Sequence, residues 1–254
     1  MSVLAGKVLL VTGAANGCGK VLAQSFADEG GTVVGCDIDR EGLAATDEAI
    51  RKAGGSADLV EVDVSDHDAV AALVDRTIER HGGLDGAVNN AGVETTGPVE
   101  HVDETAFDRL LAVNLKGVLN CMQAEIPALR ARGGGSIVNM SSVTSDITAV
   151  PSNGAYAATK GGVDALTKAA AVEVAKDNIS VNALAFAAID IPGDMIWRFL
   201  KDQKIEPADL TAAFPIGRMG RPEEFVAAVR YLLSDDARYC TGTTLVLDGG
   251  YTAQ

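Results

Sequence analysis

The stretch KVLLVTGAANGCGK, residues 7–20, decides how the rest of the chain is interpreted. Its apolar first half is typical of a buried strand, and its second half leads into a helical segment. Gly13, Gly17 and Gly19 lie between the two, where glycines let the backbone turn tightly. A glycine turn from a strand into a helix is typical of a parallel α/β sheet that holds a pyrophosphate at the helix N-terminus. The turn alone identifies no ligand, because its spacing differs from the commonest G-x-G-x-x-G fingerprint.

The same alternation of short apolar runs and longer helical segments continues along the chain and predicts βαβ units. Seven strands are expected, starting at Lys7, Thr32, Ala57, Leu84, Ser136, Ile179 and Thr243. Helices are expected near residues 18–29, 41–53, 66–80, 104–130, 155–176 and 222–234. No linker or repeat interrupts the pattern. Residues 1–254 are therefore predicted to form one α/β domain, a doubly wound seven-stranded parallel sheet with helices on both faces.

Three of the expected helices have recognisable start signals. Asp66 and Asp103 stand where a side chain can accept hydrogen bonds from the first free backbone N–H groups. Pro222 opens the last helix and is followed by Glu223 and Glu224, an order typical of a helix N-terminus.

Residues 186–221 break the alternation, because they are too long for an ordinary connection in a compact domain. They contain an apolar group made of Met195, Ile196, Trp197, Phe199 and Leu200. This content predicts a lid with a helix that covers an apolar site. A plain surface helix docked on the core would explain the same residues, and the sequence leaves both interpretations open.

The charge and the cysteine content exclude several classes of function. Lys and Arg total 21 against 35 Asp and Glu, and the resulting net charge of −14 disfavours nucleic acid and anionic membranes as partners. The four cysteines lack metal-site spacing and the three histidines lie far from every motif, so no metal is expected. There is no signal-peptide pattern, and no apolar run approaches ~20 residues. We therefore expect a cytoplasmic protein without a membrane span.

Asp37 ends the second predicted strand, about 20 residues after the glycine turn. A carboxylate at that place can accept hydrogen bonds from a ribose 2′-hydroxyl and would repel a 2′-phosphate, which favours NAD over NADP. A simple turn residue would explain Asp37 equally, given the nearby Asp39. Arg40 keeps NADP as the less favoured alternative.

The stretch GAYAATKGGVDAL, residues 154–166, carries Tyr156 and Lys160 among small and aliphatic residues. On a helix these two side chains share one face, about 5–6 Å apart at their Cβ atoms. They could form an ordinary packing pair, with the lysine stem along the ring. Alternatively, the ammonium lowers the pKa of the phenol so that it exchanges a proton near neutral pH.

These features belong to a longer series of motifs. It comprises TGxxxGxG at residues 12–19, Asp63-Val64, Asn89-Asn90-Ala91-Gly92, Asn114, Ser141-Ser142, YxxxK from Tyr156, PIGRMGRPEE from Pro215 and TGTTLVLDGG from Thr241. In this order and spacing the set resembles the short-chain dehydrogenase/reductase family over nearly the whole chain. The resemblance implies a Rossmann fold, NAD(P)-dependent oxidation or reduction at CH–OH groups, and a homotetramer in which helices 104–130 and 155–176 pack across subunits.

The resemblance also implies a role for each polar residue of the site. Tyr156 is the acid/base, and Lys160 lowers its pKa and binds the nicotinamide ribose hydroxyls. Ser142, rather than the adjacent Ser141, donates to the substrate oxygen, and Asn114 holds a proton-relay water. The chemistry agrees, because a free phenol titrates near ~10 and needs nearby positive charge to ionise at neutral pH.

A further set of residues is implied as the cofactor site. Its members are Gly13, Asn16, Gly17, Cys18, Gly19, Asp37, Ile38, Asp63, Val64, Asn90, Ala91, Gly92, Tyr156, Lys160 and Ile189. Within it, Asp63 is expected beside the adenine amino group. Asn89 is expected to brace the sheet beside the cofactor, and Val113 and Ile189 to line the pocket.

The chain departs from the family pattern after the sixth predicted strand, in NALAFAAIDIP. Phe186 and Ala187 replace a Pro-Gly pair, and Ile191 stands where the family has a Thr that bonds the nicotinamide carboxamide. The loss of one such hydrogen bond weakens binding by up to about tenfold. Phe186 is expected to add an aromatic wall to the pocket and Ile191 to make it drier, although local drift compensated by main-chain contacts is an alternative.

Three functions follow as hypotheses. The first is an NAD-dependent enzyme that interconverts a secondary alcohol and a ketone, on an apolar or cyclic substrate because of the lid. The second is a reductase of 3-oxoacyl chains on an acidic carrier protein, for which Arg130 and Arg132 would have to form a local basic patch. The third is a cofactor-binding sensor or scaffold without turnover, suggested only by the altered 186–191 segment.

Overall fold

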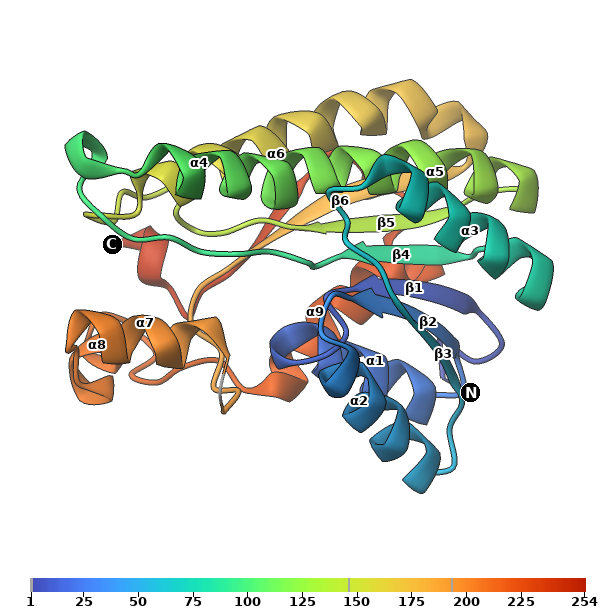
Figure 1. Cartoon of the computed structure of the whole chain (residues 1–254), viewed down its shortest axis with the longest axis horizontal. Helices are drawn as coiled ribbons and strands as arrows, with labels where there is room; N and C mark the ends of the chain where they lie inside the picture. Colours follow the sequence, from blue (N-terminus) through green and yellow to red (C-terminus); the bar gives the residue numbers. More distant parts are fainter. Residues whose placement is uncertain (1, 146, 193) are drawn as a thin grey trace.

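The computed structural model describes residues 2–145, 147–192 and 194–254, so Gly193 of the expected lid lies outside it. One parallel sheet with the strand order β3-β2-β1-β4-β5-β6-β7 forms the centre, between two layers of helices (Figure 1). The strands are β1 Val8–Thr12, β2 Thr32–Asp37, β3 Ala57–Glu61, β4 Gly86–Asn89, β5 Gly135–Met140, β6 Ile179–Phe186 and β7 Thr244–Leu247. The predicted doubly wound, seven-stranded α/β fold is confirmed.

The helices alternate with the strands as expected. They are α1 Gly17–Asp28, α2 Arg40–Lys52, α3 His67–His81, α4 Glu104–Leu110, α5 Gly117–Arg132, α6 Gly154–Val174, α7 Met195–Gln203, α8 Pro207–Ala212 and α9 Pro222–Leu233. The side chain of Asp66 accepts from the N–H groups of Asp68 and Ala69, and that of Asp103 from Ala106. Both predicted helix caps are therefore present.

The sheet buries a different set of side chains on each face, because successive strand residues point in opposite directions. Leu9 and Val11 of β1 pack with α1, α2 and α9, whereas Val8 and Leu10 pack with α3, α5 and α6. Most strands are thus apolar on both faces, as expected of a parallel sheet covered by helices on two sides.

Strand β3 ends at Glu61, although the apolar pattern extends to Val64. It is an edge strand whose only neighbour is β2, and the register ends with Asp37 beside Glu61. Beyond that point no strand remains to pair with, so the chain leaves the sheet. The side chains of Val62 and Val64, which follow the strand, are buried in the core.

The expected long helix over residues 104–130 is divided into three parts. Between α4 and α5 the backbone adopts a π-helix, Leu111–Lys116, with wider i to i+5 hydrogen bonding. Asn114 lies in this segment and is fully buried. Short π-helical segments occur frequently at functional sites, so this departure from regular α-helix points toward Asn114.

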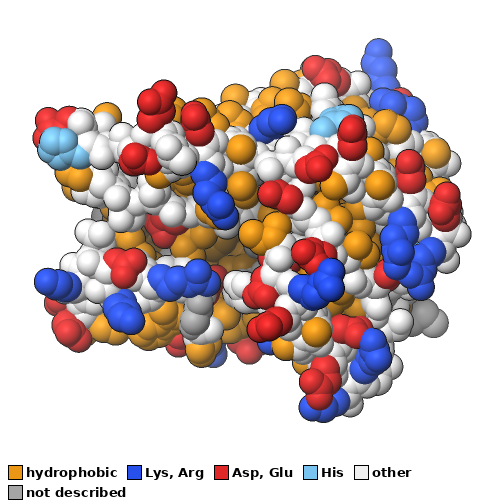
Figure 2. Space-filling view, in the orientation of Figure 1, with side chains coloured by type: hydrophobic (Ala, Val, Ile, Leu, Met, Phe, Trp, Pro, Cys, Tyr) orange, Lys and Arg blue, Asp and Glu red, His pale blue; other side chains and the backbone are white. Residues whose placement is uncertain are grey.

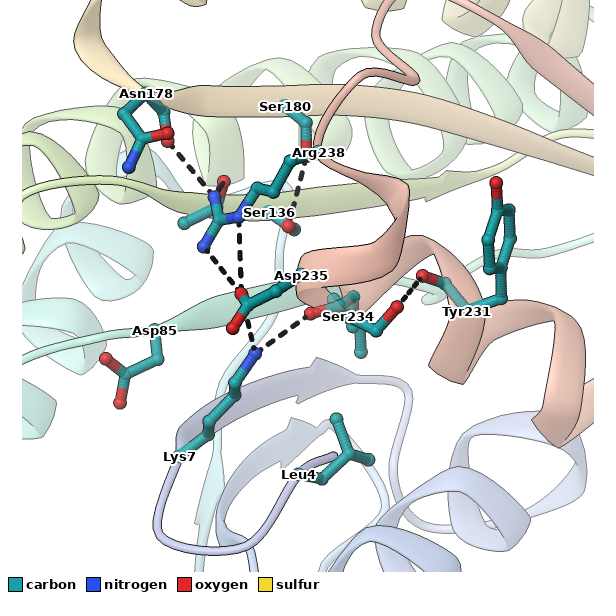
Figure 3. Close-up of polar contacts among 12 residues, drawn as sticks. Leu4, Lys7, Asp85, Ser136, Asn178, Ser180, Tyr231, Ser234, Asp235 and Arg238 are labelled. Carbon is teal, nitrogen blue, oxygen red and sulfur yellow. Dashed lines mark hydrogen bonds and ion pairs between the residues drawn. The ribbon is translucent and has the colours of Figure 1, made fainter. Parts of the chain in front are cut away.

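The amino ends of the strands are joined by a polar network, shown in Figure 3. Lys7 donates to the carbonyl of Leu233 and to Asp235 at 3.3 and 3.4 Å. Arg238 contacts the same Asp235 and also donates to the carbonyls of Gly135 and Asn178, which lie at the starts of β5 and β6. The network therefore connects the start of β1 and the end of α9 with two central strands.

The segment after β6 forms a separate lobe over the carboxyl ends of the strands, with α7 and α8 set apart from the other helices (Figure 1). Its small apolar core contains Leu200, Phe214 and Met219, with Trp197 packed against them. A parallel bridge between Ile189 and Gly220 closes the base of the lobe. The expected helix in this segment is therefore present, in a lobe with its own core, and the role of the lobe as a substrate lid stays a prediction.

Candidate active site

A cavity of about 850 Å³ lies at the carboxyl ends of the strands and continues beneath the lid. Figure 2 shows its opening as a hollow between the lid and the upper helices, with hydrophobic side chains inside. The strand order reverses between β2-β1 and β4-β5, because β1 pairs with both β2 and β4. Ligands of open α/β sheets bind in the crevice at such a reversal.

The glycine turn after β1 forms one wall of this cavity. Gly13 has a φ of +72°, and a Cβ on it would lie 2.7 Å from the side-chain nitrogen of Asn90. A Cβ on Gly19 would collide with the carbonyl of Gly13. Asn90 donates through Nδ2 to the Thr12 carbonyl at 3.0 Å, which fastens the turn to the end of β4. The turn is thus held open as a cradle of bare backbone.

Asp37 ends β2 at the far side of the same turn. Its carboxylate accepts from the N–H groups of Ala15 and Asp39, both at 3.1 Å, and therefore has a fixed orientation. Arg40 points elsewhere, because its Nε is paired with Glu61 at 2.6 Å. The end of the cavity near Asp37 consequently carries a fixed carboxylate, and Arg40 is directed away from it.

Tyr156 and Lys160 lie one turn apart on α6 and both line the cavity. The Lys160 ammonium is 5.5 Å from the centre of the tyrosine ring and donates to the carbonyl of Met140 at 2.7 Å. Burial lowers the pKa of Lys160 to about 8, and the negative charge of Asp164 opposes that shift. The two side chains therefore share one microenvironment, with a lysine that is only 4% exposed.

The pKa of Tyr156 depends on burial and on the charges around the phenol. Burial raises this pKa, and the negative charges of Glu94 and Asp194 raise it further. The sequence-based expectation joins the Lys160 ammonium with the positive charge of a docked nicotinamide, and it stays a prediction. Additional positive charge in the cavity would be required to reverse the shift.

The two serines at the end of β5 have different partners. The Ser142 hydroxyl shares a 3.0 Å hydrogen bond with the hydroxyl of Thr144 and accepts from its N–H. The Ser141 hydroxyl is buried and has no hydrogen-bond partner among residues 2–145, 147–192 and 194–254. Both line the cavity, so the geometry keeps both as candidate donors.

Asn114 fastens the cavity wall from behind. Its side chain accepts from the Val93 N–H and donates to the Val93 carbonyl, both at 2.8 Å. It also donates to Thr159 at 3.3 Å, and Thr159 in turn donates to the Tyr156 carbonyl at 2.7 Å. The π-helix therefore connects the loop after β4 with the helix turn that carries Tyr156.

The structure brings most of the predicted site residues together along the cavity. Those that line it are Gly13, Asn16, Cys18, Asp37, Ile38, Asp63, Val64, Asn90, Ala91, Gly92, Val113, Ser142, Tyr156, Lys160 and Ile189. Gly17, Gly19 and Asn114 do not line it and act from behind, through the shape of the turn and the contacts described above. Asn89 is also behind the wall, where it donates to buried Glu125 and to Asn139.

The altered segment after β6 is divided between the cavity and the core. Phe186 lines the cavity and packs against Phe225 with ring centres 5.1 Å apart, so the predicted aromatic wall is present. Ile191 is 6% exposed and packs in the main core instead of facing the cavity. The effect expected of Ile191 on the dryness of the pocket is therefore not found.

Sequence reasoning missed several polar residues of the cavity, and three of them belong to the surroundings of Tyr156 and the glycine turn. They are Glu94 after β4, Asn153 before α6, and Asp194 at the start of α7. Asp194 reaches across to the glycine turn, where its carboxylate lies 3.6 Å from the sulfur of Cys18 and would collide with a Cβ on Gly17. All three are on loops, and their positions depend on how distant segments meet, so no local pattern marks them.

The described part of the chain contains neither a cluster of metal ligands nor a membrane-spanning helix. Among these residues no group of three or more His, Cys, Asp or Glu side chains could hold a metal ion. No helix within the same ranges is both long and apolar enough to cross a membrane.

Comparison with known proteins agrees with this geometry. A family model described as enoyl-(acyl carrier protein) reductase matches residues 13–252. Cis-4-hydroxycyclohexanecarboxylate dehydrogenase of Sinomonas cyclohexanicum is 40% identical, with 98% of each chain covered. The 3-oxoacyl-acyl-carrier-protein reductase of Thermotoga maritima is 38% identical, covering 97% of this chain and 98% of that one. A gluconate 5-dehydrogenase of Burkholderia cenocepacia, solved with NADP and tartrate, superposes with a TM-score of 0.91 at 35% identity, over 99% and 97% of the two chains.

Proposed function

The chain belongs to the short-chain dehydrogenase/reductase family and is an oxidoreductase acting on hydroxyl groups; from this premise we propose its cofactor, its substrate type and the roles of its residues. The proposal is an NAD-dependent enzyme that interconverts secondary alcohols and ketones on apolar or cyclic molecules. The observation that carries it is the meeting of Tyr156, Lys160 and Ser142 in the one cavity that the glycine turn also lines.

The residues present fit a dinucleotide along this cavity. The backbone cradle at Gly13 and Gly19 leaves no room for side chains, as close approach of a pyrophosphate requires. Asp37 at one end can accept from ribose hydroxyls, and Lys160 at the other can donate to them. When bound, the nicotinamide ring supplies the acceptor or donor of hydride.

Tyr156 then moves the proton of the substrate oxygen. In alcohol oxidation its phenolate accepts the hydroxyl proton, and in ketone reduction its protonated hydroxyl donates to the oxygen. Ser142 donates a hydrogen bond to the same oxygen, and Lys160 supplies the fixed positive charge beside the phenol. The hydroxyl of Tyr156 has no hydrogen bond to another described residue, which leaves it free for this exchange.

NAD is favoured over NADP by two residues. The oriented carboxylate of Asp37 would repel a 2′-phosphate, and Arg40 is occupied by Glu61. The gluconate 5-dehydrogenase of the same fold was solved with NADP, so the preference rests on these residues of this chain. Asp37→Asn should reduce the preference for NAD over NADP by about tenfold, the scale of one charge-assisted contact. An unchanged ratio of kcat/KM for the two cofactors would count against Asp37.

The apolar end of the cavity supports a cyclic or apolar substrate. Phe186 after β6 and Met195, Ile196 and Phe199 of the lid line it. The 40% identical relative from Sinomonas is a dehydrogenase of a hydroxycyclohexane acid, which supports a ring-shaped substrate here.

The test is a panel of cyclic and open-chain alcohols and ketones with both cofactors, followed by the absorbance of the reduced nicotinamide. Wild type should reduce NAD with at least one cyclic secondary alcohol, and Tyr156→Phe should abolish the signal because it removes the hydroxyl but retains the ring. The matched control is Tyr239→Phe, a fully exposed tyrosine far from the cavity. Equal turnover by wild type and Tyr156→Phe would overturn the assignment.

A reductase of carrier-bound 3-oxoacyl chains is the second candidate, supported by the 38% identical Thermotoga enzyme. The basic patch that it needs is weak, because Arg130 is paired with Asp177 and Arg132 with Asp85. Both arginines end α5, at the amino ends of the strands and away from the cavity. Comparing turnover of a carrier-bound 3-oxoacyl chain with that of free ketones separates the two candidates. A cofactor-binding protein without turnover would show NAD binding and no reaction with the whole panel.

We place two copies of the chain face to face as part of a homotetramer. A groove of about 720 Å³ between the π-helix, α5 and α6 is lined by Leu111, Leu115, Leu119 and Leu166. Leu119 is 37% exposed in the single chain, and a second copy would cover it. Light scattering of the purified protein should give the mass of four chains, and Leu119→Glu should give smaller species. A monomeric wild type would contradict this arrangement.

The free cysteines support the cytoplasmic location. Cys18, Cys36 and Cys121 are buried thiols, and Cys240 is half-buried. Burial raises the pKa of Cys36 to about 12, which makes this thiol unreactive. Unpaired thiols of this kind are typical of reducing compartments.

A further inference from the structure

Glu94, in the loop after β4, lines the same cavity as Tyr156. The backbone of the preceding Val93 is held by Asn114 at 2.8 Å through both its N–H and its carbonyl, so the position of Glu94 is set by the fold. The side chain of Glu94 is half-buried and lines the cavity. Its negative charge acts on the phenol, which places the two groups within electrostatic range of one another.

The Glu94 carboxylate has few hydrogen-bond partners for a partly buried charge. Its one hydrogen bond comes from the Nδ2 of Asn153 at 3.4 Å, longer than the ~2.7–2.9 Å of charge-assisted bonds. Among the described residues no Lys, Arg or His forms an ion pair with it. Asn153 is buried beside it, and its Oδ1 also has no partner in the described ranges. A carboxylate can accept about four hydrogen bonds, so most of the capacity of Glu94 is unused.

The surrounding charges are mostly negative. Asp194 and Asp202 of the lid lie within electrostatic range of Glu94, and with burial they raise its pKa. The ammonium of Lys160 is directed to the Met140 carbonyl, and Arg109 and Arg198 have exposed side chains at the rim. The carboxylates near Glu94 therefore favour a ligand group that donates hydrogen bonds over an anionic group.

The lid closes over this same place. Gln203 of α7 donates to the hydroxyl of Thr96 at 3.2 Å, two residues after Glu94. A substrate group between Glu94 and Tyr156 would be enclosed on the lid side and shielded from water. Hydrogen bonds to a carboxylate are stronger in such a site than in solution.

We propose that the enzyme selects secondary alcohols that carry a second hydrogen-bond donor, a hydroxyl or an ammonium, near the reacting carbon, and that Glu94 accepts this donor. The inference rests on the proposed function and goes beyond it by naming a substrate class and the residue that selects it. Substrates with a carboxylate at the same position are disfavoured. Asn153 holds the Glu94 carboxylate in place from the side of α6.

The test compares matched compounds with wild type and Glu94→Gln. The compounds are cyclohexanol, the 1,2- and 1,3-cyclohexanediols, trans-2-aminocyclohexanol and 2-hydroxycyclohexanecarboxylate. Gln retains the shape and one acceptor but loses the charge. The control is Glu100→Gln, an exposed residue of the same segment whose carboxylate lies 3.8 Å from the Nε2 of His101. Activity with cyclohexanol reports that each variant is folded and binds NAD.

In wild type at least one diol or the amino alcohol should exceed cyclohexanol in kcat/KM by about tenfold or more, mainly through KM. In Glu94→Gln the ratio of kcat/KM for the diol or amino alcohol to that for cyclohexanol should fall to within about threefold, and Glu100→Gln should keep the wild-type ratio. Each ratio is taken at the pH optimum of that variant, because the charge of Glu94 also acts on Tyr156. The diol and amino alcohol arms distinguish a hydroxyl from an ammonium as the preferred donor. A ratio near one in wild type, or a large ratio that survives in Glu94→Gln, overturns the inference while the proposed function stands. If no alcohol reduces NAD at all, the proposed function fails and the inference fails with it.

Discussion

The two ends of the sheet satisfy their polar groups in opposite ways. At the amino ends, Lys7, Asp235 and Arg238 form a closed network in which the cations contact backbone carbonyls as well as the carboxylate (Figure 3). At the carboxyl ends, the hydroxyl of Ser141 is buried without a partner among the described residues, and that of Tyr156 has none in the same ranges. The same strands carry both ends, so the difference is not a property of the strands.

The comparison separates stability from function within one sheet. A buried polar atom without a partner costs about 1–3 kcal/mol, and one reason for such an atom in a native structure is a site that a ligand completes. At the amino ends Lys7, Asp235 and Arg238 are paired with one another or with backbone carbonyls, as expected of a network that stabilises the fold. At the carboxyl ends the hydroxyls of Ser141 and Tyr156 have no such partners among the described residues. They lie where the strand order reverses and where the proposed substrate and cofactor would bind.

Lys160→Met is the strongest way to sharpen the comparison. The substitution keeps the stem of the side chain but removes the ammonium beside Tyr156, so kcat/KM for alcohol oxidation should fall about 10²- to 10⁴-fold. Thermal stability should change little or rise, because a buried charge is removed from a site where burial lowers its pKa to about 8. Lys168→Met, on the exposed face of α6, is the control. A stable and fully active Lys160→Met protein would show that the buried ammonium at the carboxyl ends of the strands is not needed for catalysis.

Glu125→Gln tests the region between the two ends. Glu125 is fully buried, accepts from Asn89 at 3.0 Å, and has its pKa raised to about 7 by burial, an effect that the hydrogen bond from Asn89 opposes. At low pH the carboxyl is protonated in the folded and the unfolded chain. As the pH rises toward 7 only the unfolded chain ionises, so wild type loses stability relative to Gln, and above 7 the difference becomes constant. The gain of Glu125→Gln should grow by about 2 kcal/mol between about pH 5.5 and 7.5.

Denaturant unfolding at several pH values measures this effect. The control is Glu48→Gln, whose exposed carboxylate is paired with Lys52 on α2 and should show no such trend. A stability difference that stays flat with pH would mean that Glu125 titrates alike in both states. The central polar cluster would then not be an ionisable part of the fold.

The fold was predictable because each strand and helix is determined by its own local pattern. The glycine turn, Asp37 and the Tyr156-Lys160 pair lie at the ends of regular elements, where spacing along the chain fixes position in space. The early end of β3 could not be predicted from its apolar pattern. β3 lies at the edge of the sheet beside β2, so it ends where its pairing with β2 ends. The π-helix at Asn114 was missed for a similar reason, since its register is set by contacts with Val93 and Thr159.

The unpredicted part of the site depends on long-range electrostatics. Motif spacing placed Lys160 beside Tyr156 but gave no information on how deeply the phenol is buried. It also gave no sign that Glu94 and Asp194, from two separate loops, approach the phenol and raise its pKa. Such balances between burial and charge emerge only when segments distant in sequence are brought together.

Arg238→Ala tests the closed end of the sheet. The substitution removes hydrogen bonds to two backbone carbonyls and the contact with Asp235, so the free energy of unfolding should fall by about 1–2 kcal/mol. The kcat/KM of the enzyme should stay within twofold of wild type, because the cavity lies at the other end of the strands. Arg51→Ala, which removes an exposed pair with Asp47 on α2, should cost only about 0.3–0.5 kcal/mol. A fall in kcat/KM of much more than twofold in the folded variant would show that the two ends of the sheet do not act independently.

Asp194→Asn is the smallest and most specific test of the open end. Asp194 precedes α7, yet its side chain does not cap that helix and instead lies 3.6 Å from the sulfur of Cys18 at the start of α1. A pyrophosphate would approach the N–H groups of this same helix end, where the two negative groups would repel each other. Removing the charge should therefore tighten NAD binding about two- to fivefold, with a smaller gain at high salt.

Calorimetric titration of NAD into wild type and variant measures this gain, and Asp190→Asn serves as the control because that residue is exposed in the same segment. The variant should also oxidise alcohols at lower pH, since one of the charges that raise the pKa of Tyr156 is gone. Weaker NAD binding in Asp194→Asn would show that the carboxylate accepts a hydrogen bond from the cofactor instead of competing with it. In that case Asp194 would be part of the cofactor site. The lid would then supply a hydrogen-bond acceptor to the cofactor at the carboxyl ends of the strands.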